Sequence, residues 1–216
     1  MFDEGEFKTL GVATGLIALN IAVMWIFAFT PLNMINDILF GTFFFLGVAV
    51  FGLALTGGLY IARKGLSGGD KGLAVAGTAI IQVAYGVFGA GIIGFLPPAT
   101  QALAIIGAGI ASIMIALFAG LLVYGTGKDF SHWGRYSNYL FLGVFGISFI
   151  GSFTPTLIII AFALALLGFT VYLIHQIYMT KTRSETPLLN GLGIYTAFMG
   201  VFVQVIQMII RMLAKR

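Results

Sequence analysis

The polar and small residues of the last hydrophobic segment, Pro187 to Leu213, are the ones best placed to do chemistry. They recur in steps of three and four, the spacing that places residues on one face of a helix. This polar stripe consists of Asn190, Gly193, Ala197, Gly200, Gln204, Gln207 and Arg211. In so apolar a chain, the stripe indicates a membrane helix that turns this face toward protein or water, away from lipid. The stripe contains no carboxylate, which limits the functions it supports.

Further polar side chains fall in other hydrophobic segments: Asn20, Gln82, Tyr85, Ser112, Tyr172, His175 and Gln176. Two interpretations are open. These groups form hydrogen bonds between helices, each worth about 0.6 kcal/mol, or they line a polar path. The candidate path and gate residues are His175, Gln176, Ala197, Gln204 and Gln207. His175 is either an interfacial residue or a pH sensor, because imidazole titrates near neutral pH.

The residue inventory excludes most catalytic chemistry. Every lysine lies in a loop or tail, so no retinal-type Schiff base is expected. The two histidines, His132 and His175, have no neighbouring cluster of carboxylates that would complete a metal site. The chain has no cysteine and no phosphate-binding glycine motif. We therefore expect no enzyme, no cofactor and no bound metal.

Composition identifies the environment of the chain. Of its 216 residues, 60% are hydrophobic and 8% are charged, whereas soluble domains contain about 25% charged residues. The chain is therefore predicted to be a polytopic membrane protein whose main partner is the lipid bilayer. Its formal charge of +4 comes from basic residues between the hydrophobic segments. This pattern reflects membrane topology and does not predict nucleic-acid binding.

The charged residues divide the chain into five uncharged stretches, two of which are long enough for two spans each. A span needs roughly 20 apolar residues, and Pro97-Pro98 and Pro155 break the two long stretches near their middles. The predicted fold is an all-α membrane protein, a single domain over residues 1–216. Seven transmembrane helices are expected, with the last near the centre, at about 8–30, 38–62, 72–96, 101–125, 135–153, 155–178 and 187–213.

The basic residues sort to one side of these spans. The side that carries the N-terminus holds Lys8, Arg63, Lys64, Lys71, Lys128, Arg135, Lys181 and Arg183. The positive-inside rule therefore places the N-terminus in the cytoplasm. Three basic residues do not follow this pattern: Arg211, Lys215 and Arg216. The last helix therefore either crosses the membrane with an exceptional basic tail or is re-entrant. Crossing is preferred. The plasma membrane is expected for a prokaryotic source, and the endoplasmic reticulum is the alternative otherwise.

The fourth span carries small residues at every fourth position: Ala104, Ala108, Ser112, Ala116 and Gly120. Small residues at this spacing let helix backbones approach closely in lipid, where the hydrophobic effect does not drive association. Helix packing is the main interpretation of this ladder, and a pore lining is the alternative.

Two segments resemble the Bax inhibitor-1 family. The first is the fourth span with its exit turn, where Thr126, Gly127, Lys128, Asp129, Phe130 and Ser131 are similar to the family's turn. The second is the C-terminal part, where Tyr195, Phe198 and Phe202 fall on the family's aromatic positions. The resemblance covers roughly residues 101–213. It implies a seven-span fold and a calcium leak controlled by a pH-sensitive pair of aspartates.

This chain departs from the family at both aspartates, where it has Gln176 and Ala197. Two close carboxylates share a proton at mildly acidic pH and bind a hard cation when ionised, and neither replacement does so. The resemblance therefore implies an ion leak channel, of the calcium type, with altered or lost pH gating and a permeating cation as its partner. A non-conducting regulatory or interaction protein of the same fold is the alternative.

Overall fold

The computed structural model describes residues 3–36, 38–39, 44–151, 155–182 and 185–213. Within these ranges the regular structure is helical, and seven helices have 19 to 29 residues. They are α1 (Glu4–Phe29), α3 (Phe44–Gly68), α4 (Lys71–Ile93), α5 (Pro98–Thr126), α6 (Trp133–Gly151), α7 (Pro155–Lys181) and α8 (Pro187–Leu213). Two short elements, η1 (Pro31–Asn33) and α2 (Met34–Asn36), follow α1. The all-helical prediction is confirmed.

Several helix boundaries follow from local chemistry. The α5, α7 and α8 helices each begin at a proline, which suits the first helical turn because no backbone N–H is needed there. The side chain of Asp70 caps α4 by accepting the N–H of Leu73 at 3.0 Å. Gly69 and Gly127 adopt φ of +73° and +63°, which glycine tolerates best, where α3 and α5 have ended.

Five helices in the described part of the chain are long and apolar enough to cross a membrane: Glu4–Phe29, Lys71–Ile93, Ala99–Thr126, Ile159–Lys181 and Pro187–Met212. They indicate an integral membrane protein. The α3 and α6 helices occupy the places of the two other predicted spans but are not among these five. The count of seven spans therefore stays a prediction.

The helices group into two compact units. We call residues 10–101 the N-terminal unit, and residues 1–9 with 102–216 the C-terminal unit. The first boundary falls within α1, and the second falls in the first turn of α5. The helices of the two units pack through different contacts.

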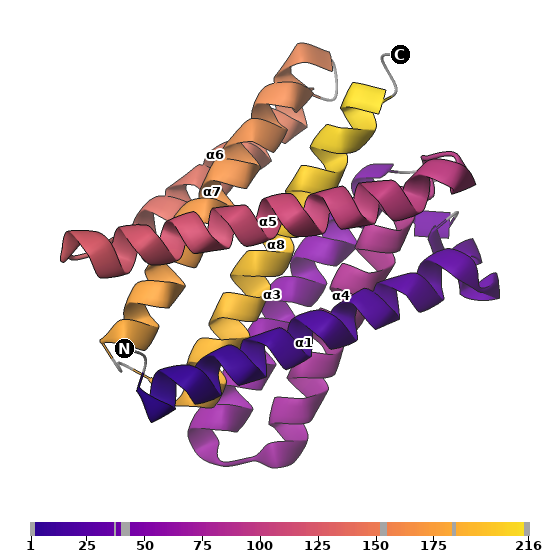
Figure 1. The fold of residues 1–216 in the computed structure, drawn as a ribbon. Helices are drawn as coiled ribbons and strands as arrows, with labels where there is room; N and C mark the ends of the chain where they lie inside the picture. The colour runs from indigo at the N-terminus through magenta and orange to yellow at the C-terminus, as the bar shows by residue number, and fades with distance from the viewer. Residues whose placement is uncertain (1–2, 37, 40–43, 152–154, 183–184, 214–216) are drawn as a thin grey trace. The chain divides into compact units, whose positions relative to one another are not determined.

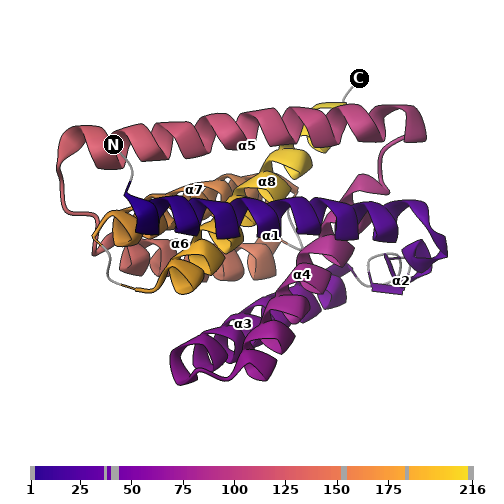
Figure 2. The same ribbon diagram turned by 60° about the horizontal axis from the view of Figure 1, so that its bottom comes forward.

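In the N-terminal unit, α3 and α4 form a tight antiparallel hairpin (Figure 2). Opposed positions meet at a constant register: Gly58 with Ile81, Ala62 with Gly77, and Gly65 with Ala74. A Cβ atom on Gly77 would overlap the backbone nitrogen of Ala62, and one on Gly65 would overlap that of Ala74. Glycine at these places therefore lets the two backbones touch.

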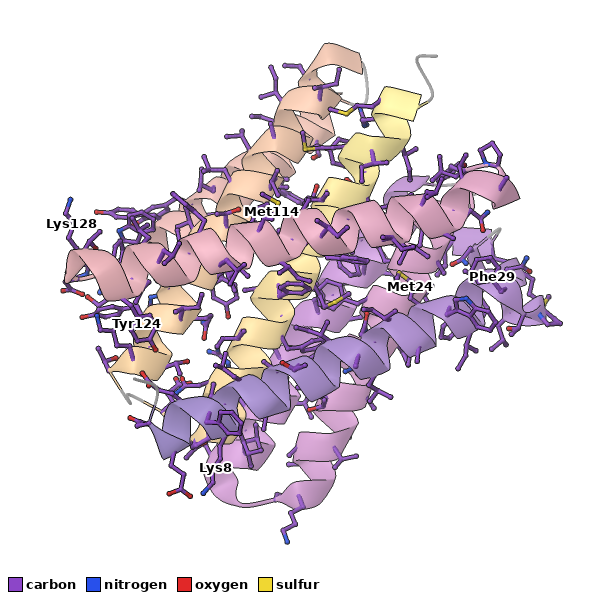
Figure 3. The ribbon with its side chains drawn as sticks, in the orientation of Figure 1. Lys8, Met24, Phe29, Met114, Tyr124 and Lys128 are labelled. Carbon is purple, nitrogen blue, oxygen red and sulfur yellow. The ribbon has the colours of Figure 1, made fainter. Side chains whose placement is uncertain are left out.

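An amide clamp joins α1 to α4 in the same unit. The Nδ2 of Asn20 donates to the backbone oxygen of Gln82 at 2.9 Å and to its Oε1 at 2.8 Å. In return, the Nε2 of Gln82 donates to the carbonyl of Leu16 at 2.9 Å. Two turns further along α4, a Cβ on Gly89 would lie 2.5 Å from the sulfur of Met24, which Figure 3 labels. For Asn20 and Gln82, the structure supports helix-to-helix hydrogen bonding over a polar path.

We expect the clamp to appear as a coupling energy. Asn20→Ala and Gln82→Ala should each destabilise the protein, and the double variant should fall short of additivity by about 0.6 to 1.7 kcal/mol, the range for interhelical hydrogen bonds. The measurement is a double-mutant cycle of unfolding free energies in detergent micelles. Strict additivity would show that the two side chains act independently.

In the C-terminal unit, α6 and α7 lie side by side, and α8 packs along α7 (Figure 1). A Cβ on Gly168 of α7 would come within 2.9 Å of the ring of Phe141 on α6. The α5 helix meets α8 where the side chain of Ile209 lies 3.6 Å from a Cβ placed on Gly107. Every predicted path and gate residue lies on α7 or α8 of this unit.

Candidate functional site

The polar stripe of α8 faces α7. A Cβ on Gly193 would overlap the side-chain oxygen of Gln176, and a Cβ on Gly200 would overlap the ring of Phe169. The two pairs lie seven residues apart on each antiparallel helix and therefore share one register. Glycines of the stripe thus receive larger side chains of α7, so at these points the stripe contacts protein. The predicted orientation, toward protein or water, agrees with this contact.

The same register continues toward the C-terminal end of α8. It places Gln204 opposite Ala165 and Gln207 opposite Phe162. Gln204 and Gln207 are 8% and 7% exposed, and Ala197 is fully buried. The two glutamines therefore do not face lipid, and the α7 positions opposite them include the small residue Ala165.

The side-chain oxygens of Gln204 and Gln207 accept no hydrogen bond from any described residue. Most buried polar atoms in proteins have a partner, and an unpartnered one costs about 1 to 3 kcal/mol. Two such oxygens lie within one turn of each other on the same face of α8. They contrast with Gln82 in the other unit, whose side-chain oxygen accepts from Asn20 and whose side-chain nitrogen donates to the carbonyl of Leu16.

The exit turn of α5 packs onto the end of α7. Phe130 is 2% exposed, and its ring lies edge-on to those of Trp133 and Tyr178 at centroid distances of 4.9 Å and 6.0 Å. The Nδ1 of half-buried His175 lies 3.1 Å from the carbonyl oxygen of Phe130. Because a carbonyl only accepts, Nδ1 carries the proton in this contact. The structure thus joins the predicted turn to one predicted gate residue.

The other turn residues hold the backbone in shape. The hydroxyl of Thr126 donates to the carbonyl of Leu122 at 2.7 Å and accepts the N–H of Lys128 at 3.4 Å. Asp129 accepts the N–H of Ser131 at 2.7 Å. The side chains of Thr126, Lys128, Asp129 and Ser131 are exposed. The turn is therefore a surface structure anchored by Phe130.

Hydrogen bonds from the N–H and hydroxyl of Ser131, and from the hydroxyl of Tyr178, hold the pKa of Asp129 below its ordinary value of 3.8. A lowered folded-state pKa stabilises the fold above the unfolded pKa, and this contribution is lost as pH falls through the folded pKa. We expect Asp129→Asn to lower the melting temperature at pH 7. The difference from wild type should shrink as the pH falls below about 4, through the lowered pKa of Asp129. Melting curves across this range provide the check, and a pH-independent difference would contradict the explanation.

The small-residue ladder of α5 is buried over its first half. Ala104, Ala108 and Ser112 are at most 2% exposed, whereas Ala116 and Gly120 are half-buried. A Cβ on Gly120 would meet nothing within 4 Å. Steps of four advance 400° on a helix with 3.6 residues per turn, so the ladder rotates away from the packed face. Burial passes to Ala119 and Val123 instead, which are fully buried.

A network at the N-terminus of the chain was missed by reasoning from sequence. Glu6 is 7% exposed and accepts a hydrogen bond from the hydroxyl of Tyr124 at 2.7 Å. Lys181 donates to the carbonyl of Val123 at 2.9 Å, and its Nζ lies 5.1 Å from the ring centre of Tyr124. Tyr124 lies near Lys128 at the C-terminal end of α5 (Figure 3).

A sequence signal for this network was present. Asp3 and Glu6 form a reciprocal capping box, in which each backbone N–H donates to the carboxylate of the other residue at 2.8 Å and 2.9 Å. An acidic residue followed by glutamate three positions later, at the start of an apolar run, is typical of such a box. The pattern predicts the helix start, but it does not predict Tyr124 as a partner.

These elements define an all-helical protein with five potential membrane spans and a buried polar stripe. Among the described residues, no three histidine or carboxylate side chains gather as candidate metal ligands. Comparison with protein-family models, with curated proteins and with solved structures finds no match to this chain. The resemblance to the Bax inhibitor-1 family therefore stays a prediction.

Proposed function

We propose that this protein is a multi-pass membrane protein similar to the Bax inhibitor-1 family, and that it acts as a leak channel for a small cation. One observation carries the proposal: Gln204 and Gln207 are buried in an apolar span with unpartnered carbonyl oxygens. Oxygen atoms of this kind replace part of the hydration shell of a permeating ion. The path runs along the polar stripe where α8 faces α7.

The neutral side chains of the stripe suit the conduction of an ion better than its tight binding. Conduction requires that an ion binds well enough to enter and weakly enough to leave. Neutral amide oxygens meet this condition, since they attract a cation without the charge of a carboxylate. An ion or a water molecule between the helices would also offset the cost of leaving two buried oxygens without donors.

Packing around Gln176 and His175 would close one end of the proposed path. Gln176 is 4% exposed and packs onto Gly193, and His175 is held on the carbonyl of Phe130. With Gln176 and Ala197 in place of carboxylates, the gate lacks the acidic pair that would share a proton. We therefore expect a leak that lacks the pH dependence an acidic pair would give.

The proposed topology has seven spans with the N-terminus in the cytoplasm. The positive-inside pattern supports this orientation, and α3 and α6 would complete the count. Among the five potential spans, the apolar window of α8 is the most buried, at 83%. That burial supports the placement of α8 near the centre of the bundle.

A specific observation favours the alternative, a non-conducting regulatory protein of the same fold. Gly193 and Gly200 receive Gln176 and Phe169 so closely that the contact leaves no space for an added methyl group. A tightly packed interface of this kind is also what a purely structural helix pair requires.

The test is a conductance measurement on purified protein in planar bilayers, in KCl and then in CaCl₂, at pH 6 and pH 8. Wild-type protein is expected to conduct at both pH values. A Gln176→Asp, Ala197→Asp double variant should conduct in a pH-dependent manner, because the two new carboxylates titrate together. Protein-free bilayers are the baseline. Absence of conductance in both salts would favour the non-conducting alternative.

A further inference from the structure

The polar stripe ends at a fixed positive charge. Arg211 lies one turn beyond Gln207 on the same face of α8, and its guanidinium carbon is 4.2 Å from the ring centre of Phe162. The register of the two helices places Phe162 opposite Gln207. The face of the Phe162 ring holds the guanidinium of Arg211 beside the end of the stripe. An ion that reaches the two glutamine oxygens must therefore approach this guanidinium.

Neither α7 nor α8 contains a carboxylate side chain that could compensate this charge. Residues 130–184 and 186–213 contain neither aspartate nor glutamate. Glu185 precedes the first turn of α8, and Arg211 lies 24 residues beyond Pro187. At 1.5 Å per residue this separation is about 36 Å, so Glu185 and Arg211 lie at opposite ends of α8. Asp129 lies at the same distant end, beside Tyr178.

We propose that the stripe passes monovalent cations such as K⁺ and excludes Ca²⁺. This inference rests on the proposed leak-channel function. Ca²⁺ takes six to eight oxygen ligands and relies on carboxylates, whereas the stripe offers neutral amides. The cost of dehydrating an ion rises with the square of its charge, and repulsion by Arg211 is twice as large for a divalent ion. All three effects act in the same direction.

The placement of Arg211 also predicts which residue sets the selectivity. Gln204 and Gln207 supply oxygens to any cation, so they do not by themselves distinguish valence strongly. The guanidinium beside Phe162 acts on charge alone. Removing it should raise Ca²⁺ permeability more than K⁺ permeability.

The experiment measures reversal potentials in planar bilayers with KCl on one side and CaCl₂ on the other. Wild-type protein is expected to prefer K⁺ by at least about tenfold, a factor that corresponds to 1.4 kcal/mol. Arg211→Gln should lower that ratio at least about threefold. Lys71→Gln is the matched control, because it removes one positive charge from an exposed residue at the start of α4. The control should leave the ratio unchanged.

The outcomes separate this inference from the proposed function. Equal or greater permeability to Ca²⁺ in the wild type, or an anion-selective reversal potential, would overturn the inference. Absence of current in both salts would overturn the proposed function itself. Where Arg211→Gln fails to fold, Phe162→Leu is the second variant, because it releases the guanidinium from the ring. The permeability ratio of K⁺ to Ca²⁺ in the wild type also tests the inference without any variant.

Discussion

Replacing Gly77 by alanine is expected to destabilise the protein by about 2 to 3 kcal/mol, the upper range for overpacking a filled interface. The added methyl group would overlap the backbone nitrogen of Ala62 and lie 2.6 Å from the carbonyl oxygen of Gly58. Neither atom is the mobile end of a side chain, so α3 and α4 must separate. The measurement is the free energy of unfolding in detergent, followed by circular dichroism.

Gly57→Ala provides the matched control. Gly57 is a helical glycine next to Gly58, but a Cβ there would meet nothing within 4 Å. Alanine is about 1 kcal/mol more favourable than glycine inside a helix, so this variant should be as stable as wild type or more stable. Equal losses in both variants would show that helix contact does not explain the effect at Gly77.

Replacing both Gln204 and Gln207 by leucine is expected to reduce single-channel or macroscopic conductance at least about tenfold. Leucine removes the two oxygens that would replace the hydration shell of the ion. The same variant should keep or gain stability, because it replaces unpartnered buried polar groups by apolar groups of similar size. The bilayer assay and a melting curve on one preparation measure both effects.

Gln82→Leu distinguishes a path from a structural role. Gln82 is equally buried, but its amide is fully engaged with Asn20 and Leu16. This variant should lose up to about 1.7 kcal/mol of stability and keep its conductance. A Gln204→Leu, Gln207→Leu variant that conducts normally would sink the proposed path. One that loses stability as Gln82→Leu does would mean that the two glutamines serve packing.

Charge and apolar length were sufficient to place most of the helices. The prediction of 38–62 was wrong at its end, because α3 continues through Arg63 and Lys64 to Gly68. The segments predicted at 72–96 and 187–213 correspond to α4 and α8, whose starts at Lys71 and Pro187 follow from the Asp70 cap and from proline. The polar stripe was also predictable, because helical periodicity alone groups its residues on one face.

Pairing between helices was much less predictable. Periodicity predicts which residues share a face, but it does not predict which helix covers that face. The tightest contacts found in the N-terminal unit involve Gly65 and Gly77, which no sequence pattern had singled out. The ladder of α5 was predicted at every fourth residue, yet rotation moves burial from Gly120 to Ala119.

The buried carboxylate of Glu6 escaped prediction for a different reason. Its segment is acidic and polar, so composition predicts an exposed end of the chain. Burial arises from Tyr124, which lies 118 residues further along the sequence and donates its hydroxyl to Glu6. Contacts across such sequence distances are not encoded in local pattern.

The α3–α4 hairpin also bears on the order in which the protein folds. Its paired positions are close in sequence, since Ile81 follows Gly58 by 23 residues, so little loop entropy opposes their meeting. Synthesis at about 5 to 20 residues per second delays the end of α8 behind the end of α4 by roughly 6 to 24 seconds. During that interval the hairpin must persist in the membrane before the C-terminal unit has been synthesised. Backbone contact at Gly65 and Gly77 gives the nascent chain an early folded piece that does not depend on what is still to be made.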